Sequence, residues 1–278
     1  MKKFIKSNFD FNDKETVSII DELPLWSAPF GLRLLETVVL RRNIAALDIG
    51  FGSGFPLIEI AQRLGSSSKV FGIDPWKAAV DRTKTKIDLL GIKNVVLIEG
   101  VAESIPLPND SIDVIVSNNG INNVQNLEKV FEECNRVAKK SAQFVIAVNL
   151  DGTMLEFYNE LENILRNDGL YDNILKLKKH IYEKRRPLDE LILLFEKNNF
   201  SIRGVKTDSF QCRYVDATAM FSHSLIRTAF LDSWIDLVPA DKEEEIFSRV
   251  ESNLNKTAEI NGQLILTIPF VIIDAVRT

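Results

Sequence analysis

The chain contains few of the residues that hold metals or perform acid–base chemistry. Its 278 residues include only two cysteines and two histidines. The cysteines, Cys134 and Cys212, form no cluster at metal-ligand spacing, so no metal site is expected. Cys134 lies in a predicted helix, where we interpret it as a reduced thiol of the core. That interpretation fits a cytoplasmic protein, because disulfides are rare in that compartment.

The sequence also has no long apolar segment, no signal peptide and no excess of positive charge, which argues against membrane and nucleic-acid partners. No apolar stretch approaches the roughly 20 residues that a membrane-spanning helix needs, so no membrane partner is expected. The first residues are basic, but polar side chains soon interrupt any apolar core, so no signal peptide is expected. The net charge is −5, whereas nucleic-acid binding needs positive surface, so no nucleic-acid partner is expected.

A glycine-rich turn is the most informative segment that is present. Residues 44–49 are apolar enough for a buried strand, and residues 57–64 have the apolar spacing of a helix. Between them lie Gly50, Gly52 and Gly54. A strand, a glycine turn and a helix bring bare backbone and helix N–H groups close to a ligand. The pattern therefore predicts a binding site here, and the alternative is a tight turn without a ligand.

The glycine spacing separates the possible ligands. The dinucleotide fingerprint would need its third glycine where Phe55 stands, and no P-loop Gly-Lys-Ser/Thr follows. Asp48 lies two positions before the first glycine. An acid followed by G-x-G-x-G resembles the first motif of the class I S-adenosylmethionine-dependent methyltransferases. The resemblance implies that Asp48, Gly50, Gly52 and Gly54 belong to the cofactor site.

Asp74 ends a second predicted strand, residues 69–74. A carboxylate at this strand tip can accept hydrogen bonds from both ribose hydroxyls, in methyltransferases as in nicotinamide-binding folds. The resemblance implies that Asp74 binds the ribose and that Trp76 lies against the adenine ring. The alternative roles are a helix N-cap for Asp74 and packing over the first helical turn for Trp76.

A strand, a loop and another strand follow over residues 95–117. In the resembling family, the loop after the third strand carries an acid followed by alanine, and both contact the adenine. Here Val101 stands at the acidic position, and Ala102 and Glu103 follow it. Either Glu103 replaces the missing acid, or backbone alone holds the adenine.

Asn118 and Asn119 follow the fourth predicted strand, at the end of the sheet where ligands bind in doubly wound folds. The resemblance implies that these amides contact the amino-acid part of the cofactor. The alternative is a loop of turn formers that caps the next helix. The Asn-Pro-Pro-Tyr signature of amino-adenine methyltransferases is absent, which argues again against a nucleic-acid acceptor.

Residues 44–150 together resemble the branch that includes ubiquinone and menaquinone biosynthesis enzymes. The resemblance implies an α/β fold, with a doubly wound, seven-stranded, mostly parallel sheet and an antiparallel seventh strand from residue 264. We expect a methyltransferase domain over residues 44–278, with helical cap inserts at about 151–185 and 214–261. Helices within residues 1–43 are expected to cover the cofactor site, with Trp26 as part of its roof.

Local patterns give further expectations for the remaining segments. A capping box of Asn12 and Glu15 predicts a helix to about Leu23, and a second helix is expected over residues 31–39 after an apolar loop at 25–31. Candidate residues for the acceptor pocket are mostly aromatic, and each has core packing as its alternative. They are Tyr158, Tyr171, Tyr214, Met220, Phe221, His223 and Trp234.

The expected function is in-line methyl transfer from S-adenosylmethionine to a small-molecule acceptor. The protein would then supply positioning and exclude water. A hydroxyl acceptor would benefit from a general base, for which His223 is the candidate. His180 lies in a basic run and is expected on a solvated helix face. The alternative functions are a cofactor-binding regulatory protein without catalysis and a nicotinamide-dependent oxidoreductase.

Overall fold

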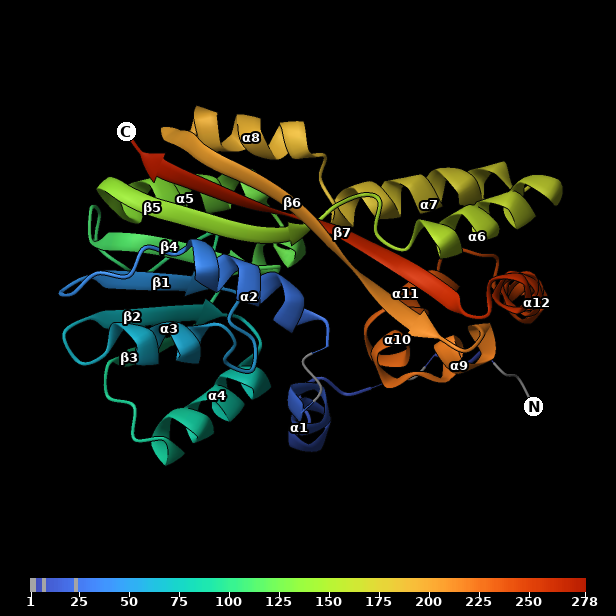
Figure 1. The fold of residues 1–278 in the computed structure, drawn as a ribbon, viewed down its shortest axis with the longest axis horizontal. Coiled ribbons are helices and arrows are strands. Elements are labelled where there is room, and N and C mark those ends of the chain that lie inside the picture. The colour runs from blue at the N-terminus through green and yellow to red at the C-terminus, as the bar shows by residue number, and fades with distance from the viewer. Residues whose placement is uncertain (1–3, 7–8, 23–24) are drawn as a thin grey trace. The chain divides into compact units, whose positions relative to one another are not determined.

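The computed structural model describes residues 4–6, 9–22 and 25–278 (Figure 1). These residues form two compact units. The sheet unit contains residues 10–149, 186–208 and 270–278, apart from the two residues that are not described. The helical unit contains residues 150–185 and 209–269 together with the described residues up to Phe9.

The described residues form a seven-stranded sheet in the order β3-β2-β1-β4-β5-β7-β6. Strands β1 to β5 pair in parallel, and β7 pairs antiparallel with β5, so the expected mostly parallel, doubly wound sheet is confirmed. The bounds are β1 Ala45–Ile49, β2 Lys69–Asp74, β3 Val95–Glu99, β4 Ile112–Asn118, β5 Ala138–Asn149, β6 Phe200–Tyr214 and β7 Leu264–Arg277. The strand order reverses between β1 and β4, which are neighbours, and such a switch point leaves a crevice at the strand ends.

Helices of the sheet unit cover these strands. Helix α2 packs on β4 and β5, α3 on β2, and α4 on β3, while α1 packs on α4. Because the central strands are covered, β1 and β4 are buried along almost their whole length and consist largely of aliphatic residues. The helices are α1 Lys14–Glu22, α2 Ser27–Thr37, α3 Leu57–Leu64, α4 Lys77–Leu89, α5 Leu127–Val137 and α8 Leu188–Lys197, with a 3₁₀ turn, η1, at Gly120–Asn123.

Two expectations for the first helices are wrong. Asp13 caps α1, because its carboxylate accepts from the Thr16 N–H at 3.0 Å, in place of the expected capping box that starts at Asn12. Helix α2 begins at Ser27, so residues 27–31 are helical and not a loop. Pro29 is tolerated because it falls in the first turn, where N–H groups have no helical partner. Leu23, the expected end of the first helix, lies outside the described residues.

The helical unit has an aromatic core. Phe157 stacks on Trp234, with ring centroids 3.8 Å apart, and Phe221 and Phe247 pack around them. The helices are α6 Leu155–Asn167, α7 Tyr171–Lys184, α9 Ala217–Ser222, α10 Ser224–Ala229, α11 Leu231–Ile235 and α12 Glu243–Asn261. The described part of the chain contains no helix that is both long and apolar enough to cross a bilayer. The cap role of these segments stays a prediction.

Most of the candidate acceptor-pocket residues are packed in that core. Tyr158, Met220, Phe221 and Trp234 are at most 4% exposed, whereas Tyr171 is exposed on the surface. Packing alone therefore explains the four buried side chains, as is usual for aromatic residues at helical spacing.

Candidate functional site

A cavity of about 490 Å³ opens at the carboxyl ends of β1, β2 and β4. It lies at the switch point, where doubly wound sheets bind ligands. Nine of the predicted site residues line it: Trp26, Gly50, Gly52, Asp74, Trp76, Ala102, Glu103, Asn118 and Asn119. The other lining residues are Ser27, Ile49, Ile73, Pro75, Val101, Gly120, Asn123, Val124 and Gln125. The structure thus brings together residues that span a hundred positions of sequence.

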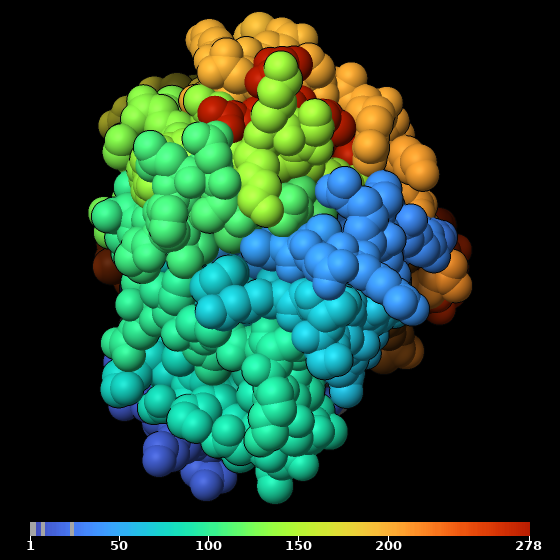
Figure 2. Space-filling model, turned by 90° about the vertical axis from the view of Figure 1, so that its left-hand side faces the viewer, coloured from blue at the N-terminus to red at the C-terminus, as the bar shows by residue number. Residues whose placement is uncertain are grey.

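A second, larger hollow of about 990 Å³ lies at the opposite ends of the strands. It is lined by residues that precede or begin β1, β2 and β3, among them Ile44, Lys69 and Asn94. Figure 2 shows this face of the sheet unit, with the loop before β2 in cyan. Size alone does not make it the better candidate, because parallel sheets present their ligand-binding loops at the carboxyl ends.

The floor of the cavity is formed by backbone. A Cβ atom on Gly50 would lie 2.5 Å from the Cα of Gly120, and one on Gly120 would lie 2.2 Å from the Ile49 carbonyl oxygen. The Gly50 N–H donates to the Ile73 carbonyl at 2.9 Å, which closes the turn against β2. Glycine is therefore required where the loops after β1 and β4 meet.

Asp74 has acceptor capacity left for a ligand. Its Oδ2 accepts from the Gly52 N–H and its Oδ1 from the Trp76 N–H, both at 2.8 Å. Each carboxylate oxygen has about two acceptor positions, so one on each remains. Burial raises the pKa of Asp74, and the two backbone N–H groups partly oppose that rise. The geometry suits a ligand that donates two hydrogen bonds.

The two tryptophans at the cavity are held by aromatic neighbours. Trp76 donates its indole N–H to the Phe11 carbonyl and lies edge-on to the Phe11 ring, with centroids 5.9 Å apart. Trp26 lies edge-on to Phe30 at 5.3 Å. Trp76 also packs against the buried cluster that contains Val17 of α1 and two alanines of α4. It therefore has a structural role in addition to its place in the cavity lining.

The loop after β3 is tied to the start of α5. Glu103 Oε1 accepts from the N–H groups of Gln125 at 2.8 Å and Asn126 at 3.1 Å. This carboxylate therefore orders two loops that line the cavity, a role that no local sequence pattern indicates. Glu103 has a structural function beside any contact with a ligand.

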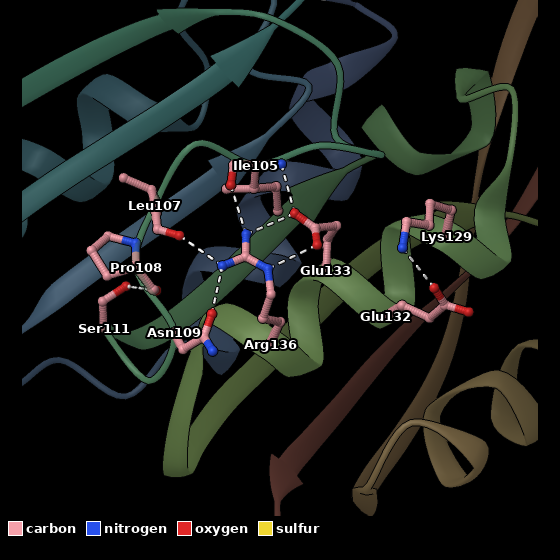
Figure 3. A network of polar contacts seen from close by, with 9 residues as sticks. All are labelled: Ile105, Leu107, Pro108, Asn109, Ser111, Lys129, Glu132, Glu133 and Arg136. Atoms are coloured by element: carbon pink, nitrogen blue, oxygen red, sulfur yellow. Dashed lines mark hydrogen bonds and ion pairs between the residues drawn. The ribbon is translucent and has the colours of Figure 1, made fainter.

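Arg136 on α5 clamps the next part of the same loop (Figure 3). Its guanidinium donates to the carbonyls of Ile105 at 2.7 Å and Leu107 at 2.8 Å and to Asn109 Oδ1 at 2.9 Å. Two further bonds of 2.8 and 2.7 Å join it to Glu133, which also accepts from the Ile105 N–H. All five N–H donors of the arginine are thus used. Arg136 also holds the pKa of Glu133 below its usual range.

Replacing Arg136 by methionine is expected to lower the free energy of unfolding by about 2–4 kcal/mol, because it removes the positive partner of the Glu133 carboxylate and the hydrogen-bond donor of the Leu107 carbonyl. Lys129, also drawn in Figure 3, pairs with the exposed Glu132, so Lys129→Met is the matched control and is expected to change the free energy of unfolding much less. Urea unfolding measures both. Equal effects of the two substitutions would contradict the clamp.

Asn118 and Asn119 carry polar atoms that no described residue satisfies. The Asn118 Nδ2 donates to the Ser27 carbonyl at 3.0 Å, whereas its Oδ1 is buried without a partner. Asn119 has a left-handed backbone, with φ 58°, and its Oδ1 accepts from the Asn149 N–H at 3.1 Å, but its Nδ2 is unpartnered. A buried polar atom without a partner costs about 1–3 kcal/mol. One free acceptor and one free donor therefore belong to the side chains that line the cavity.

Two predicted cofactor residues, Asp48 and Gly54, do not line the cavity. A Cβ on Gly54 would lie 2.8 Å from Ile58 Cδ1, so this glycine allows α3 to pack. Asp48 is fully buried, and neither carboxylate oxygen has a hydrogen-bond partner among the described residues. Burial and the nearby Asp74 carboxylate raise the pKa of Asp48 well above its usual range, and the Leu57 N–H opposes this.

We expect Asp48→Asn to stabilise the protein at neutral and higher pH. Because the pKa of Asp48 is raised by folding, the unfolded chain loses its proton first, and stability falls as the pH rises through the folded pKa. The substitution removes this cost, with an expected gain of about 1–3 kcal/mol near pH 8 that vanishes below the unfolded pKa. Urea unfolding at several pH values, with the exposed Asp88→Asn as control, measures it. A loss of stability at high pH would contradict the argument.

The two histidines lie in the helical unit. His223 caps α10, because its Nδ1 accepts from the Leu225 N–H at 3.2 Å, and its ring lies edge-on to Tyr214 at 5.4 Å. Its role as a catalytic base stays a prediction. The lysines of the basic run are exposed, as expected for a solvated helix face, but His180 itself is half-buried. Its Nε2 lies 3.2 Å from the Tyr158 hydroxyl, and burial is the largest of the effects that lower its pKa to about 4. The described residues contain no group of three or more His, Cys, Asp or Glu placed to hold a metal ion.

Comparison with known proteins places the chain in a family. A model described as a methyltransferase domain matches residues 40–188. The uncharacterized methyltransferase YcgJ of Bacillus subtilis (strain 168) is 24% identical over 222 residues, which are 78% of this chain and 75% of YcgJ. The demethylmenaquinone methyltransferase of Anoxybacillus flavithermus (strain DSM 21510 / WK1) is 28% identical over 123 residues. That match covers 44% of this chain and about half of the relative, 52%.

Solved structures share the fold. The crystal structure of YcgJ has a TM-score of 0.58 at 20% identity and covers 90% of this chain and 98% of that chain. Geranyl diphosphate C-methyltransferase from Streptomyces coelicolor A3(2), solved with Mg²⁺, geranyl diphosphate and S-adenosyl-L-homocysteine, has a TM-score of 0.56 at 16% identity. It covers 95% of this chain and 84% of that one. Since the family model matches more than half of its residues, this chain belongs to the methyltransferase domain family.

Proposed function

We propose that the protein binds S-adenosylmethionine in the cavity at the carboxyl ends of β1, β2 and β4 and transfers its methyl group to a small-molecule acceptor. The observation that carries this proposal is the charge of the cavity. Asp74 and Glu103 line it, and none of the described lining residues is lysine or arginine. S-adenosylmethionine brings a positive sulfonium and a positive ammonium group, which suit such a site.

The residues fit each part of the cofactor. The remaining acceptor positions of Asp74 suit the two ribose hydroxyls. The loop at Val101, Ala102 and Glu103, with Trp76 nearby, suits the adenine. The unpartnered Asn118 Oδ1 and Asn119 Nδ2 suit the ammonium and carboxylate of the methionine part. When bound, the cofactor supplies an electrophilic methyl group, and these side chains orient it and exclude water.

The same cavity argues against a nicotinamide dinucleotide. A dinucleotide brings two negative phosphates, and phosphate sites in proteins use basic side chains or the N–H groups of a glycine-rich turn. Here the third fingerprint glycine is replaced by Phe55, and no basic side chain in the described lining offsets Asp74 and Glu103. The acidic cavity therefore favours the cationic cofactor.

The acceptor is proposed to be a small molecule. The chain has a net charge of −5, which does not favour nucleic acid, and relatives with this fold carry names of small-molecule methyltransferases. His223 remains the candidate general base for a hydroxyl acceptor. A carbon or nitrogen acceptor needs no such base.

Calorimetry and isotope transfer test the proposal together. We expect S-adenosylmethionine and S-adenosylhomocysteine to bind, NAD not to displace them, and label from methyl-labelled S-adenosylmethionine to appear in a metabolite extract. Binding without transfer to any component of a broad extract would favour a regulatory protein. Displacement of the cofactor by NAD at comparable concentration would overturn the assignment of the cavity.

A further inference from the structure

A buried arginine of the helical unit has hydrogen-bonding capacity that no described residue uses. Arg185, directly after α7, is 3% exposed. Its Nη1 donates to the Tyr158 hydroxyl at 3.4 Å, its Nε is buried without a partner, and no carboxylate of the described residues forms an ion pair with it. Arg136, by contrast, uses all five of its donors. Arg185 therefore holds a positive charge that no described carboxylate neutralises and a buried Nε–H without a partner.

Tyr158, the side chain that the structure places in contact with the Arg185 guanidinium, has no acceptor capacity left. The Tyr158 hydroxyl accepts from Trp234 Nε1 at 3.0 Å and from Arg185, which fills both of its lone pairs. Its proton is then donated to His180 Nε2 at 3.2 Å, so that nitrogen is also occupied. The guanidinium carbon also lies 5.4 Å from the centre of the Tyr158 ring, a contact that uses no N–H donor.

The charges nearby do not neutralise the guanidinium. Burial, together with the charges of Arg185 and Lys184, lowers the pKa of His180 to about 4, and the charge of Glu183 partly opposes that shift. His180 is therefore neutral at physiological pH. Because the charge of Arg185 lowers the pKa of His180, an anion that binds beside the arginine is expected to change that pKa.

A buried charge without a partner costs several kcal/mol, so natural proteins rarely keep one without use. The planar guanidinium fork matches the oxygen geometry of carboxylate and phosphate groups. We propose that Arg185 is the anchor of a binding site for the oxyanion group of a small molecule, a carboxylate or a phosphate, and that Tyr158, Trp234 and His180 hold the arginine in position. The site lies in the helical unit, so the inference goes beyond the cofactor site and does not depend on it.

Histidine NMR tests this directly, because the chain contains only His180 and His223. In the full-length protein with ¹³C-labelled histidine, His223→Gln assigns the two signals. Inorganic phosphate is then titrated against sodium chloride at equal ionic strength. Phosphate is expected to raise the pKa of His180 from its value of about 4, because a bound anion neutralises Arg185, and to leave His223 unchanged.

Three variants make the test specific. Arg185→Gln is expected to weaken phosphate binding at the His180 signal by tenfold or more, as expected for loss of a charge-assisted contact worth at least about 1.4 kcal/mol. Arg185→Lys keeps the charge without the fork and is expected to bind with intermediate strength, which also covers the case in which the glutamine variant does not fold. Arg166→Gln, which removes an exposed partner of Glu162, is the control and is expected to bind as the unaltered protein does.

The results separate the sources of the anion. A stronger response to phosphate than to sodium acetate assigns a phosphorylated ligand, and the reverse assigns a carboxylate. An equal response to chloride, no response of His180 to phosphate or acetate, or unchanged binding in Arg185→Gln would overturn the proposal. Cofactor binding, measured separately, is expected to stay normal in all three variants.

Discussion

Gly52→Val is expected to weaken binding of S-adenosylhomocysteine by ~100-fold or more, equivalent to about 2.7 kcal/mol. Gly52 lines the cavity, and a Cβ built on it meets no protein atom within 4 Å. A valine side chain would therefore enter the space that we assign to the cofactor. The backbone at Gly52 has φ +53°, so any side chain also costs about 1–2 kcal/mol of conformational strain.

A matched substitution separates obstruction from strain. Gly91 has φ +66°, is likewise free of neighbours within 4 Å, and lies outside this cavity. Gly91→Val is expected to lower the melting temperature to a similar extent and to leave cofactor affinity unchanged. Calorimetry on both variants gives the comparison. If Gly52→Val bound S-adenosylhomocysteine with normal affinity, the placement of the cofactor in this cavity would be wrong.

Asp74→Ala is expected to weaken the same ligand by ~10- to 150-fold, because a hydrogen bond to a charged group is worth about 1.5–3 kcal/mol. The substitution removes the acceptors that we assign to the ribose hydroxyls. It also releases the N–H groups of Gly52 and Trp76, which the carboxylate now holds at 2.8 Å. Asp74→Asn keeps one carbonyl acceptor and is expected to have a smaller effect.

Asp81→Ala is the control for this substitution. Asp81 is an exposed carboxylate on α4 whose partner is Lys77, so its loss is expected to leave the affinity unchanged. A deoxy analogue of the ligand that lacks a ribose hydroxyl completes the test. The unaltered protein is expected to bind this analogue more weakly than S-adenosylhomocysteine. Asp74→Ala is expected to bind the two ligands with about equal affinity. The same loss of affinity in both proteins would show that Asp74 does not contact the ribose.

Local sequence sufficed for the elements at the centre of the sheet. Strand β2 and helix α3 have the bounds expected from residues 69–74 and 57–64, because short-range apolar spacing and a terminal glycine determine them. Asp74 and the glycines could be placed near one another since parallel strands end at one edge. In this case the parallel sheet alone brings these residues to the same cavity.

Contacts between distant positions could not be predicted in this way. The Arg136 clamp joins α5 to loop carbonyls up to 31 positions away, and no local pattern marks a backbone carbonyl as a partner. Asp48 has the spacing of a ligand-binding residue, yet its side chain is enclosed. His180 belongs to a basic run, but burial depends on the tyrosine of another helix. Tertiary packing decides all three.

The meeting of Gly50 and Gly120 has a consequence for how this protein can evolve. At this point the backbones of the two loops are in direct contact, so no residue larger than glycine fits at either position. A substitution at either glycine would have to move β1 and β4 apart before it could change the shape of the cavity. Adaptation to a new substrate is therefore expected to proceed through other positions, while this contact passes unaltered between descendants with different acceptors.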